Sequence, residues 1–435
     1  MLVTYALLVR KDQILSTNML SLPKEWTMDN GIRVLLDPMS GIRSVSIGVF
    51  LHTGSAMESP QEWGLSHFME HMVFKGTAHR SARDIAMETD AAGGHFNAFT
   101  ARDCTCFYAS VIDEDLGKAL DILSDLTLHA TLAQEDMEKE RGVILEEIAM
   151  EEDDPEGTIE ELVHQKMYAD LPVAHEIVGY PEQVSRYTRD DLVRFRDSHY
   201  APSRCVISVS GSFEEAVLLS LLEKAFGNWS SPLSDIRQAP VQPVCFSPVY
   251  RDRDLEQMHL CLTYPALSYG SQELTTLSLL SSILGGQSSS RLFMRVREDL
   301  GLAYSLYSYS YALEATGTFS IYAAASPANI ARVHAEIHKE LSSFLKNGCT
   351  EQEMQDGKNF LRISNLMSLE HSSSRMMSQG QTKLFTGKPF DLGKSIEKLQ
   401  KITRDQLMDL AQSLFSHTPV LGLLGPGAEA IGGQL

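Results

Sequence analysis

Residues 64–77, GLSHFMEHMVFKGT, contain two histidines four positions apart with a glutamate between them. On a helix, positions i and i+4 lie about 6 Å apart on one face, so His67 and His71 could bind one metal ion. Glu70 would project beside this pair, close enough to hold a water without binding the metal. Two imidazoles suit zinc, which lowers the pKa of a bound water toward ~7 so that a carboxylate can accept its proton. The spacing predicts a hydrolytic zinc site, and the competing interpretation is the solvated face of an ordinary amphipathic helix.

The pattern H-x-x-E-H is the inverted zincin motif, but it is short and occurs by chance in roughly a few per cent of such chains. Zinc needs a third protein ligand, and candidates lie in the helix that we predict over residues 133–153. Glu140 and Glu147 are two turns apart on one face of it, where one could bind zinc and the other orient a histidine. Neighbouring glutamates make this an acidic surface helix in any case, so spacing alone leaves Glu146 and Glu147 open as the ligand.

The helix that carries the motif has recognisable start and stop signals. Ser59 can cap it, Pro60 suits its first position, and Glu62 completes an S-x-x-E capping box. Gly76 can end it, which predicts a helix over about residues 60–75. Its inward apolar stripe consists of Leu65, Phe68, Met69 and Met72.

Three longer segments, HFMEHMVFKGT, GGHFNAFTARDCTCFYA and EKERGVILEEI, resemble the pitrilysin family of zinc metallopeptidases. The branch is that of the mitochondrial processing peptidase β subunit and its bacterial relatives, and the similarity covers roughly residues 25 to 425. In that family a glutamate on a later helix is the third zinc ligand. A second essential glutamate lies two turns before this ligand on the same helix. The resemblance therefore implies that Glu147 binds Zn²⁺ with the two histidines and that Glu140 stands behind them.

The segment GGHFNAFT resembles the edge strand of this family, to which a peptide substrate adds as an extra strand. The resemblance implies that Asn97 and Ala98 line the peptide and that Phe99 forms an apolar pocket for the residue after the cleaved bond. Inward packing of Phe99 as an ordinary strand residue is the alternative interpretation.

The segment RVREDLGLAY in the second half resembles the one that supplies an arginine and a tyrosine from the opposite domain. Arg297 and Tyr304 fit best, with Tyr304 donating to the oxyanion, and Arg295 is an alternative to Arg297. The second half has no H-x-x-E-H, so we expect it to bind no zinc. His129, like several other histidines, has no partner at ligand spacing and is interpreted as a surface or core residue.

The order of predicted elements repeats along the 435 residues: strand, helix, glycine-containing turn, strands, long helices and a late strand. This predicts an α+β fold of two duplicated domains, each a mostly antiparallel sheet with helices on one side, as in processing peptidases. The expected parts are an N-terminal extension (1–22), a zinc-binding catalytic domain (23–230), a proline-rich linker (231–248) and a degenerate duplicate without zinc (249–435).

Composition excludes several classes of partner. The net charge is −20 and no basic stripe occurs, which argues against a nucleic-acid partner. No apolar run reaches the ~18 to 20 residues of a membrane span, so we expect no membrane partner. Six cysteines do not form a disulfide framework, which favours reduced, intracellular thiols. We expect a bacterial cytoplasmic protein rather than one of the mitochondrial matrix or a plastid, because Asp12 is unusual in a mitochondrial leader.

Together these features predict a zinc metalloendopeptidase that cleaves unfolded peptides or presequence-like segments, with Glu70 as the base. The alternative is a non-catalytic scaffold or peptide-binding subunit of a heteromeric complex. One zinc domain and one degenerate domain amount to half of the long single-chain enzymes of the family. We therefore expect a homodimer that closes around an acidic chamber, or else a heterodimer with an inactive paralogue.

Overall fold

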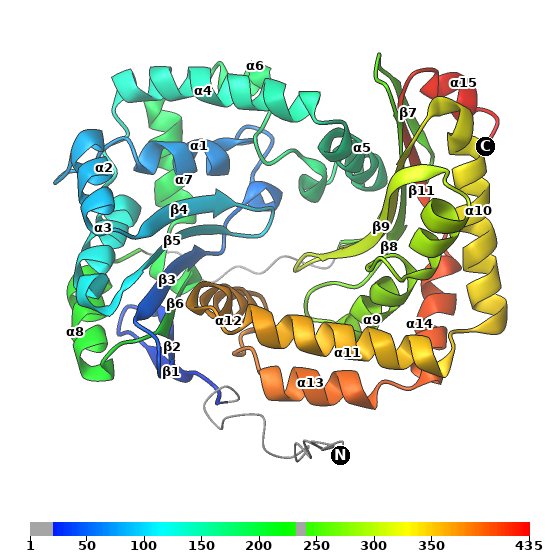
Figure 1. Cartoon of the computed structure of the whole chain (residues 1–435). Coiled ribbons are helices and arrows are strands. Elements are labelled where there is room, and N and C mark those ends of the chain that lie inside the picture. Colours follow the sequence, from blue (N-terminus) through cyan, green and yellow to red (C-terminus); the bar gives the residue numbers. More distant parts are fainter. Residues whose placement is uncertain (1–20, 232–240) are drawn as a thin grey trace, which may run out of the picture.

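The computed structural model describes residues 21–231 and 241–435, which we call the N-terminal and C-terminal halves (Figure 1). Most of the expected N-terminal extension (1–22) and about half of the expected linker (231–248) lie outside the described residues. Each half contains one sheet packed with helices, which confirms the predicted α+β class. Among the described residues no helix has the length and apolar character needed to cross a bilayer. All six cysteines are free thiols.

The N-terminal sheet has the strand order β1-β2-β6-β3-β5-β4. Its strands are β1 (Lys24–Thr27), β2 (Arg33–Pro38), β3 (Ser44–Leu51), β4 (His95–Thr100), β5 (Thr105–Ile112) and β6 (Cys205–Gly211). Neighbouring strands are antiparallel except for the parallel pair β2–β6. β4 pairs only with β5 and therefore leaves one edge of the sheet open.

The C-terminal sheet repeats this topology with the order β7-β11-β8-β10-β9. Its strands are β7 (Val249–Asp252), β8 (Met258–Pro265), β9 (Ala303–Ala312), β10 (Gly317–Ala325) and β11 (Val420–Gly425). β7 and β11 form a parallel pair, as β2 and β6 do in the first sheet. β9 occupies the edge position that β4 has in the other sheet. Only β1 has no counterpart, so the two sheets are duplicates in strand order and direction.

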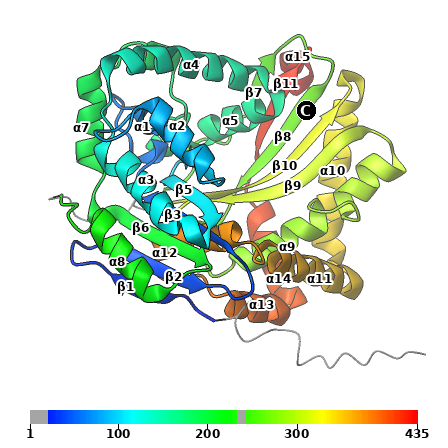
Figure 2. The ribbon, with the colours of Figure 1, turned by 60° about the vertical axis from the view of Figure 1, so that its left-hand side comes forward.

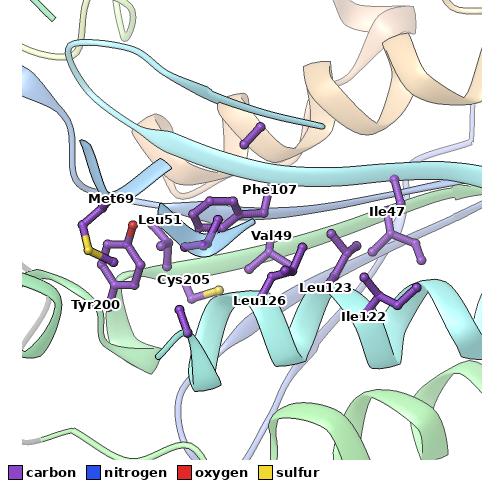
Figure 3. Packing of buried hydrophobic residues seen from close by; sticks show 14 of the residues in the cluster. Ile47, Val49, Leu51, Met69, Phe107, Ile122, Leu123, Leu126, Tyr200 and Cys205 are labelled. Carbon is purple, nitrogen blue, oxygen red and sulfur yellow. The ribbon is translucent and has the colours of Figure 1, made fainter. Parts of the chain in front are cut away.

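The helices of the N-terminal half surround the first sheet and connect its strands. They are α1 (Leu65–Val73), α2 (Ala82–Ala91), α3 (Leu116–His129), α4 (Gln134–Asp153), α5 (Pro155–Tyr168), α6 (Pro181–Val184), α7 (Arg189–His199) and α8 (Glu215–Phe226). One face of the sheet packs on α3, where Ile47 and Val49 of β3 lie against Leu123 and Leu126 (Figure 3). These buried residues form the largest apolar core and hold α1 beside β4.

The helices of the C-terminal half play the same part for the second sheet. They are α9 (Leu274–Leu284), α10 (Pro327–Asn347), α11 (Glu351–Ser368), α12 (Ser372–Thr386), α13 (Leu392–Lys401), α14 (Arg404–Phe415) and α15 (Ala428–Gly432). A π-helical turn, η5 (Phe293–Asp299), precedes β9. The apolar core of the C-terminal half joins β8 and β10 to α9, α10 and α14.

The two halves exchange one helix each, which the sequence did not predict. α12 of the C-terminal half packs on β3 and β6, and α5 of the N-terminal half packs on β8 and β11 (Figures 1 and 2). The expectation of helices on one side of each sheet is therefore wrong. Both sheets are covered on both faces: every residue of β6 and of β10 is buried.

Small residues let the exchanged helices approach closely. A Cβ at Gly380 of α12 would lie 2.1 Å from the ring of Phe50, and one at Gly48 of β3 would lie 2.4 Å from Met376 Sδ. At the other contact, a Cβ at Gly422 of β11 would lie 2.4 Å from Val163 of α5. Each exchanged helix therefore relies on glycine at the contact, because a side chain there would collide with its neighbour.

Candidate metal centre

The helix that carries the H-x-x-E-H motif begins five residues later than its sequence signals indicate. Ser59 and Glu62 do interact, with the Ser59 hydroxyl donating to Glu62 Oε2 at 2.7 Å, but within a turn ahead of α1. Gly64 adopts φ +91° and packs against Gly179, where a Cβ would lie 2.8 Å from the Gly179 Cα. The left-handed backbone of Gly64 cannot belong to an α-helix. α1 therefore starts at Leu65, and the predicted start at residue 60 is wrong.

Glu58 replaces the missing cap of α1. Its buried carboxylate accepts hydrogen bonds from the backbone N–H groups of Gly64 at 2.7 Å and Ser66 at 2.6 Å. N–H groups at a helix N-terminus have no acceptor within the helix, and Glu58 provides one. A carboxylate also interacts favourably with the helix dipole. The N-terminal end of α1 is thereby fixed two residues before His67.

α4 lies alongside α1 and brings a carboxylate to the two histidines (Figure 1). Glu147 Oε2 lies 3.2 Å from His71 Nε2 and 3.6 Å from His67 Nε2. One ligand atom from each of the three residues lies within 4.8 Å of the others. Two imidazole nitrogens and one carboxylate oxygen form the donor set of a catalytic zinc site and leave its fourth position open. Glu146, the alternative that spacing left open, is exposed and does not belong to the group.

Glu140 orients one of the histidines. Its Oε2 lies 3.2 Å from His71 Nδ1, and its Oε1 accepts a 2.8 Å bond from Lys75 Nζ. A carboxylate can only accept here, so this contact favours the tautomer with its proton on His71 Nδ1, which leaves the lone pair of Nε2 for a metal shared with Glu147. The buried Glu140 thus occupies the position that the sequence comparison implied, behind the ligands.

Glu70 lies beside the ligand group and contacts the edge strand. Thr100 Oγ1, at the end of β4, donates a 2.6 Å hydrogen bond to Glu70 Oε2. Burial raises the pKa of Glu70, although the bond from Thr100 opposes this effect. Burial, together with the neighbouring His71, lowers the pKa of His67 to about 3, so this imidazole is neutral as a metal ligand must be.

The three residues expected to contact substrate lie on β4. Asn97 is exposed, and its side chain accepts a hydrogen bond from Ala98 N, whereas Ala98 points into the core beneath α1. Phe99 points to the opposite face and lies half-buried against the apolar cluster beneath α12, next to Tyr108. Both interpretations of Phe99 have some support, since it packs inward yet remains partly accessible beside the open edge.

Arg297 and Tyr304 lie together but apart from the ligand group. The Arg297 guanidinium stacks over the rings of Tyr304 and Phe293, 4.8 Å from each ring centre. These residues line a cavity of about 650 Å³, and Tyr304 is 73% exposed. Arg295 forms an ion pair with Glu336 at 2.9 Å, so the geometry favours Arg297 over Arg295. Within the described residues, neither Arg297 nor Tyr304 forms a hydrogen bond or ion pair with the ligand group.

A second group of possible metal ligands was missed. His79, Asp125 and His129 also place one ligand atom each within 4.8 Å of the others. The sequence interpretation of His129 as a residue without a partner at ligand spacing is wrong, because Asp125 lies four positions before it on the same helix. Only His79, fifty positions earlier, has no local spacing that links it to His129. Both groups found in the described part of the chain belong to the N-terminal half.

Comparison with known proteins identifies the family. The family model described as insulinase, peptidase family M16, matches residues 33–180, and the one described as peptidase M16 inactive domain matches residues 186–361. The uncharacterized zinc protease YmxG of Bacillus subtilis is 36% identical over 408 residues, covering 93% of this chain and 99% of that protein. The uncharacterized zinc protease Rv2782c of Mycobacterium tuberculosis is 37% identical over 415 residues, covering 93% of each.

Solved structures show the same fold. A protease from Helicobacter pylori superimposes with a TM-score of 0.86 at 21% identity, covering 93% of this chain and all of the other. A peptidase M16 inactive domain from Pseudomonas fluorescens gives 0.85 at 19% identity, covering 93% and 98%. With relatives this similar over nearly the whole sequence, the chain belongs to peptidase family M16, the pitrilysin family of zinc metallopeptidases.

Proposed function

We propose that the protein is a zinc-dependent endopeptidase that cleaves unfolded peptides. The observation that carries this proposal is the convergence of His67 Nε2, His71 Nε2 and Glu147 Oε2 beside the half-buried carboxylate of Glu70. A zinc ion held by these three residues would polarise the scissile carbonyl and lower the pKa of a water toward ~7.

Glu70 acts as the general base in this proposal. A carboxylate whose pKa is raised by burial accepts a proton more readily than one in water, and it can later pass that proton to the leaving amine. Thr100 holds one carboxylate oxygen of Glu70 and leaves the other free to face the attacking water. Glu140 and Lys75 contribute indirectly by fixing the orientation of His71.

The open edge of β4 supplies the substrate site. An extended peptide that adds to this edge forms main-chain hydrogen bonds that do not depend on its sequence, which suits an enzyme for unfolded chains. A strand paired along residues 95–100 ends at Thr100, and Thr100 contacts Glu70, so the peptide is delivered to the base. Asn97 and Ala98 would lie along the peptide, and Phe99 would contact an apolar side chain after the cleaved bond.

Arg297 and Tyr304 keep the role that the resemblance implies, as donors to the oxyanion from the second half. Their separation from the ligand group means that this role requires the two halves to close on the substrate. A homodimer that encloses an acidic chamber would hold such a closed form, and a heterodimer with an inactive paralogue would do the same. Light scattering on the purified chain, with cleavage measured on a short peptide and on a folded protein, tests the assembly.

A peptidase assay combined with zinc analysis tests the central proposal. The wild-type chain should contain zinc and cleave an unfolded peptide within its interior, and a chelator should stop the cleavage. Glu70→Gln should retain zinc and lose turnover, whereas Glu147→Ala should lose the metal, with Glu146→Ala as the matched control on the exposed neighbour. Undiminished cleavage by Glu70→Gln would exclude Glu70 as the base. A zinc-loaded chain that binds peptide without cleaving it would instead favour a peptide-binding subunit.

A further inference from the structure

His79, Asp125 and His129 meet where the loop after α1 crosses the end of α3. Asp125 and His129 are four positions apart on α3, so they share one face in the same way as His67 and His71 do on α1. His79 lies in the loop between α1 and α2, and its ring centre is 5.1 Å from that of His129. The two rings are nearly perpendicular and both are exposed, so solvent ions can reach them.

Backbone hydrogen bonds hold this loop against α3. Ala78 N donates to His129 O at 2.9 Å, and Thr131 N donates to Gly76 O at 3.0 Å. His79 is thus placed next to Asp125 by main-chain contacts of the residues that directly precede it. The fold brings the three side chains together before any ligand binds. This lowers the entropic cost of ordering them on binding.

Asp125 is fixed by its surroundings with one oxygen directed at the histidines. Its Oδ2 accepts hydrogen bonds from Thr77 Oγ1 at 2.6 Å and Arg80 at 2.8 Å. Its Oδ1 lies 2.7 Å from His79 Nδ1. The buried carboxylate therefore has one oxygen held by protein donors and one that faces an imidazole, as a metal-binding aspartate requires.

The charge around the group favours a cation. A cavity of about 430 Å³ adjoins the three residues, and its charged lining consists of Arg80 and Lys224 against Glu88, Asp121 and Asp125. Arg80 is itself paired with all three carboxylates. The histidines add no charge when neutral, so the site carries excess negative charge and suits a divalent ion better than an anion.

We propose that His79, Asp125 and His129 form a second binding site for a divalent transition metal of the zinc type. Two imidazoles and a carboxylate are ligands that zinc prefers over magnesium or calcium, and water would complete the coordination. Two donors about 2.0–2.1 Å from a tetrahedral zinc lie about 3.4 Å apart, so the three ligand atoms, which lie within 4.8 Å of one another, must move closer together around the ion. The exposed rings of His79 and His129 can make this movement by small rotations.

Metal bound here would join the loop after α1 to the end of α3. This loop begins at Phe74, three residues after His71, and includes Lys75, which contacts Glu140. The second metal therefore stabilises the segment that leads out of the proposed zinc helix without contacting the reacting groups. Its removal should affect stability before it affects chemistry.

Zinc stoichiometry on the full chain tests this site. After equilibrium dialysis against buffered free zinc, the wild type should bind about two ions per chain by elemental analysis, and both His79→Gln and His129→Gln about one. His417→Gln, which removes an exposed histidine elsewhere, should leave the value at about two. Glu147→Ala should also bind about one ion, and Glu147→Ala/His129→Gln should bind none.

A thermal scan provides the second measurement. In the Glu147→Ala background, added zinc should raise Tm by a few degrees, because a ligand that binds only the folded chain stabilises it. The same addition should have no effect in Glu147→Ala/His129→Gln. A wild type whose single zinc ion is lost in Glu147→Ala and kept in His129→Gln, or a second ion retained by both histidine variants, would overturn the proposal.

Discussion

Thr100 Oγ1 donates a 2.6 Å hydrogen bond to Oε2 of Glu70. The bond joins the last residue of the edge strand β4 to the middle of α1, between the two histidines of the motif. It therefore couples the surface on which a peptide would pair to the carboxylate that would activate water. Nothing in the spacing of the H-x-x-E-H motif indicates this contact, because the two residues are thirty positions apart.

Thr100→Val should weaken the proposed base by removing this bond. A hydrogen bond to a carboxylate favours its ionised form, so the loss raises the already elevated pKa of Glu70 further. The acidic limb of kcat/KM should move to higher pH by about one unit, since bonds to charged groups contribute about 1.5–3 kcal/mol. Thr100→Ser keeps the hydroxyl and should keep the wild-type profile. An unchanged limb in Thr100→Val would mean that Glu70 is not the group that titrates.

Glu140→Gln should lower zinc affinity about 10- to 100-fold without removing a ligand. The substitution keeps an acceptor near His71 Nδ1 but removes the negative charge that makes His71 Nε2 a stronger ligand for the metal. Competition with a zinc chelator of known affinity measures the change. Glu146→Gln, on the exposed side of the same helix, is the control and should bind zinc as the wild type does. Equal affinities in the two variants would contradict the orienting role of Glu140.

Tyr304→Phe should reduce kcat about 10²- to 10³-fold with little change in KM, if Tyr304 donates to the oxyanion. The tyrosine is exposed, so the loss of its hydroxyl should not alter folding. Steady-state kinetics on an unfolded peptide provides the measurement, and Tyr311→Phe on the same strand is the control. A loss confined to KM would assign Tyr304 to substrate binding instead.

Arg375→Met should destabilise the contact between the halves by about 3–5 kcal/mol. Arg375 of α12 forms a two-bond ion pair with Asp37 of β2, at 2.7 and 2.5 Å, and both residues are buried. Removal of the arginine leaves a buried carboxylate without its partner. Asp37→Leu/Arg375→Met should recover much of the loss in urea denaturation, because no charge then remains. Lys394→Met breaks an exposed pair and should cost less than about 1 kcal/mol.

Asp103 should make the stability of the protein fall with rising pH. Burial raises the pKa of its carboxyl to about 6 from the ordinary value of 3.8. Between these values the folded state holds a proton that the unfolded chain has lost. The resulting stabilisation is complete below pH 3.8 and disappears as pH rises through about 6. Relative to Asp103→Asn, the wild type should lose about 1.4 kcal/mol between pH 5 and 8 in urea denaturation. A pH-independent difference between the two proteins would contradict this origin.

Much of the proposed site follows from local sequence. His67, Glu70 and His71 share one helix face because the helical period alone sets their directions, whatever the rest of the chain does. The strands at residues 33–51 and 95–112 were likewise predictable from their patterns and turn residues. The repeated order of elements also predicted two duplicated sheets, which the strand order confirms.

The choice between Glu146 and Glu147 shows where local sequence stops being sufficient. Both lie on α4, and only the rotation of α4 against α1 directs Glu147 to the histidines and leaves Glu146 exposed. The family resemblance selected Glu147, but spacing did not. Rotation depends on which apolar face of α4 packs on the core, and the acidic sequence of this helix makes that face narrow.

The exchange of α5 and α12 and the meeting of His79 with His129 were decided by tertiary structure alone. Each sheet is covered by helices on both faces, but the strand sequences do not say which helix covers the second face. Likewise, the hydrogen bonds of the loop after α1 bring together two histidines that no helical or strand period connects. The sequence by itself determined the chemistry available on each element, and long-range packing decided which of those elements meet.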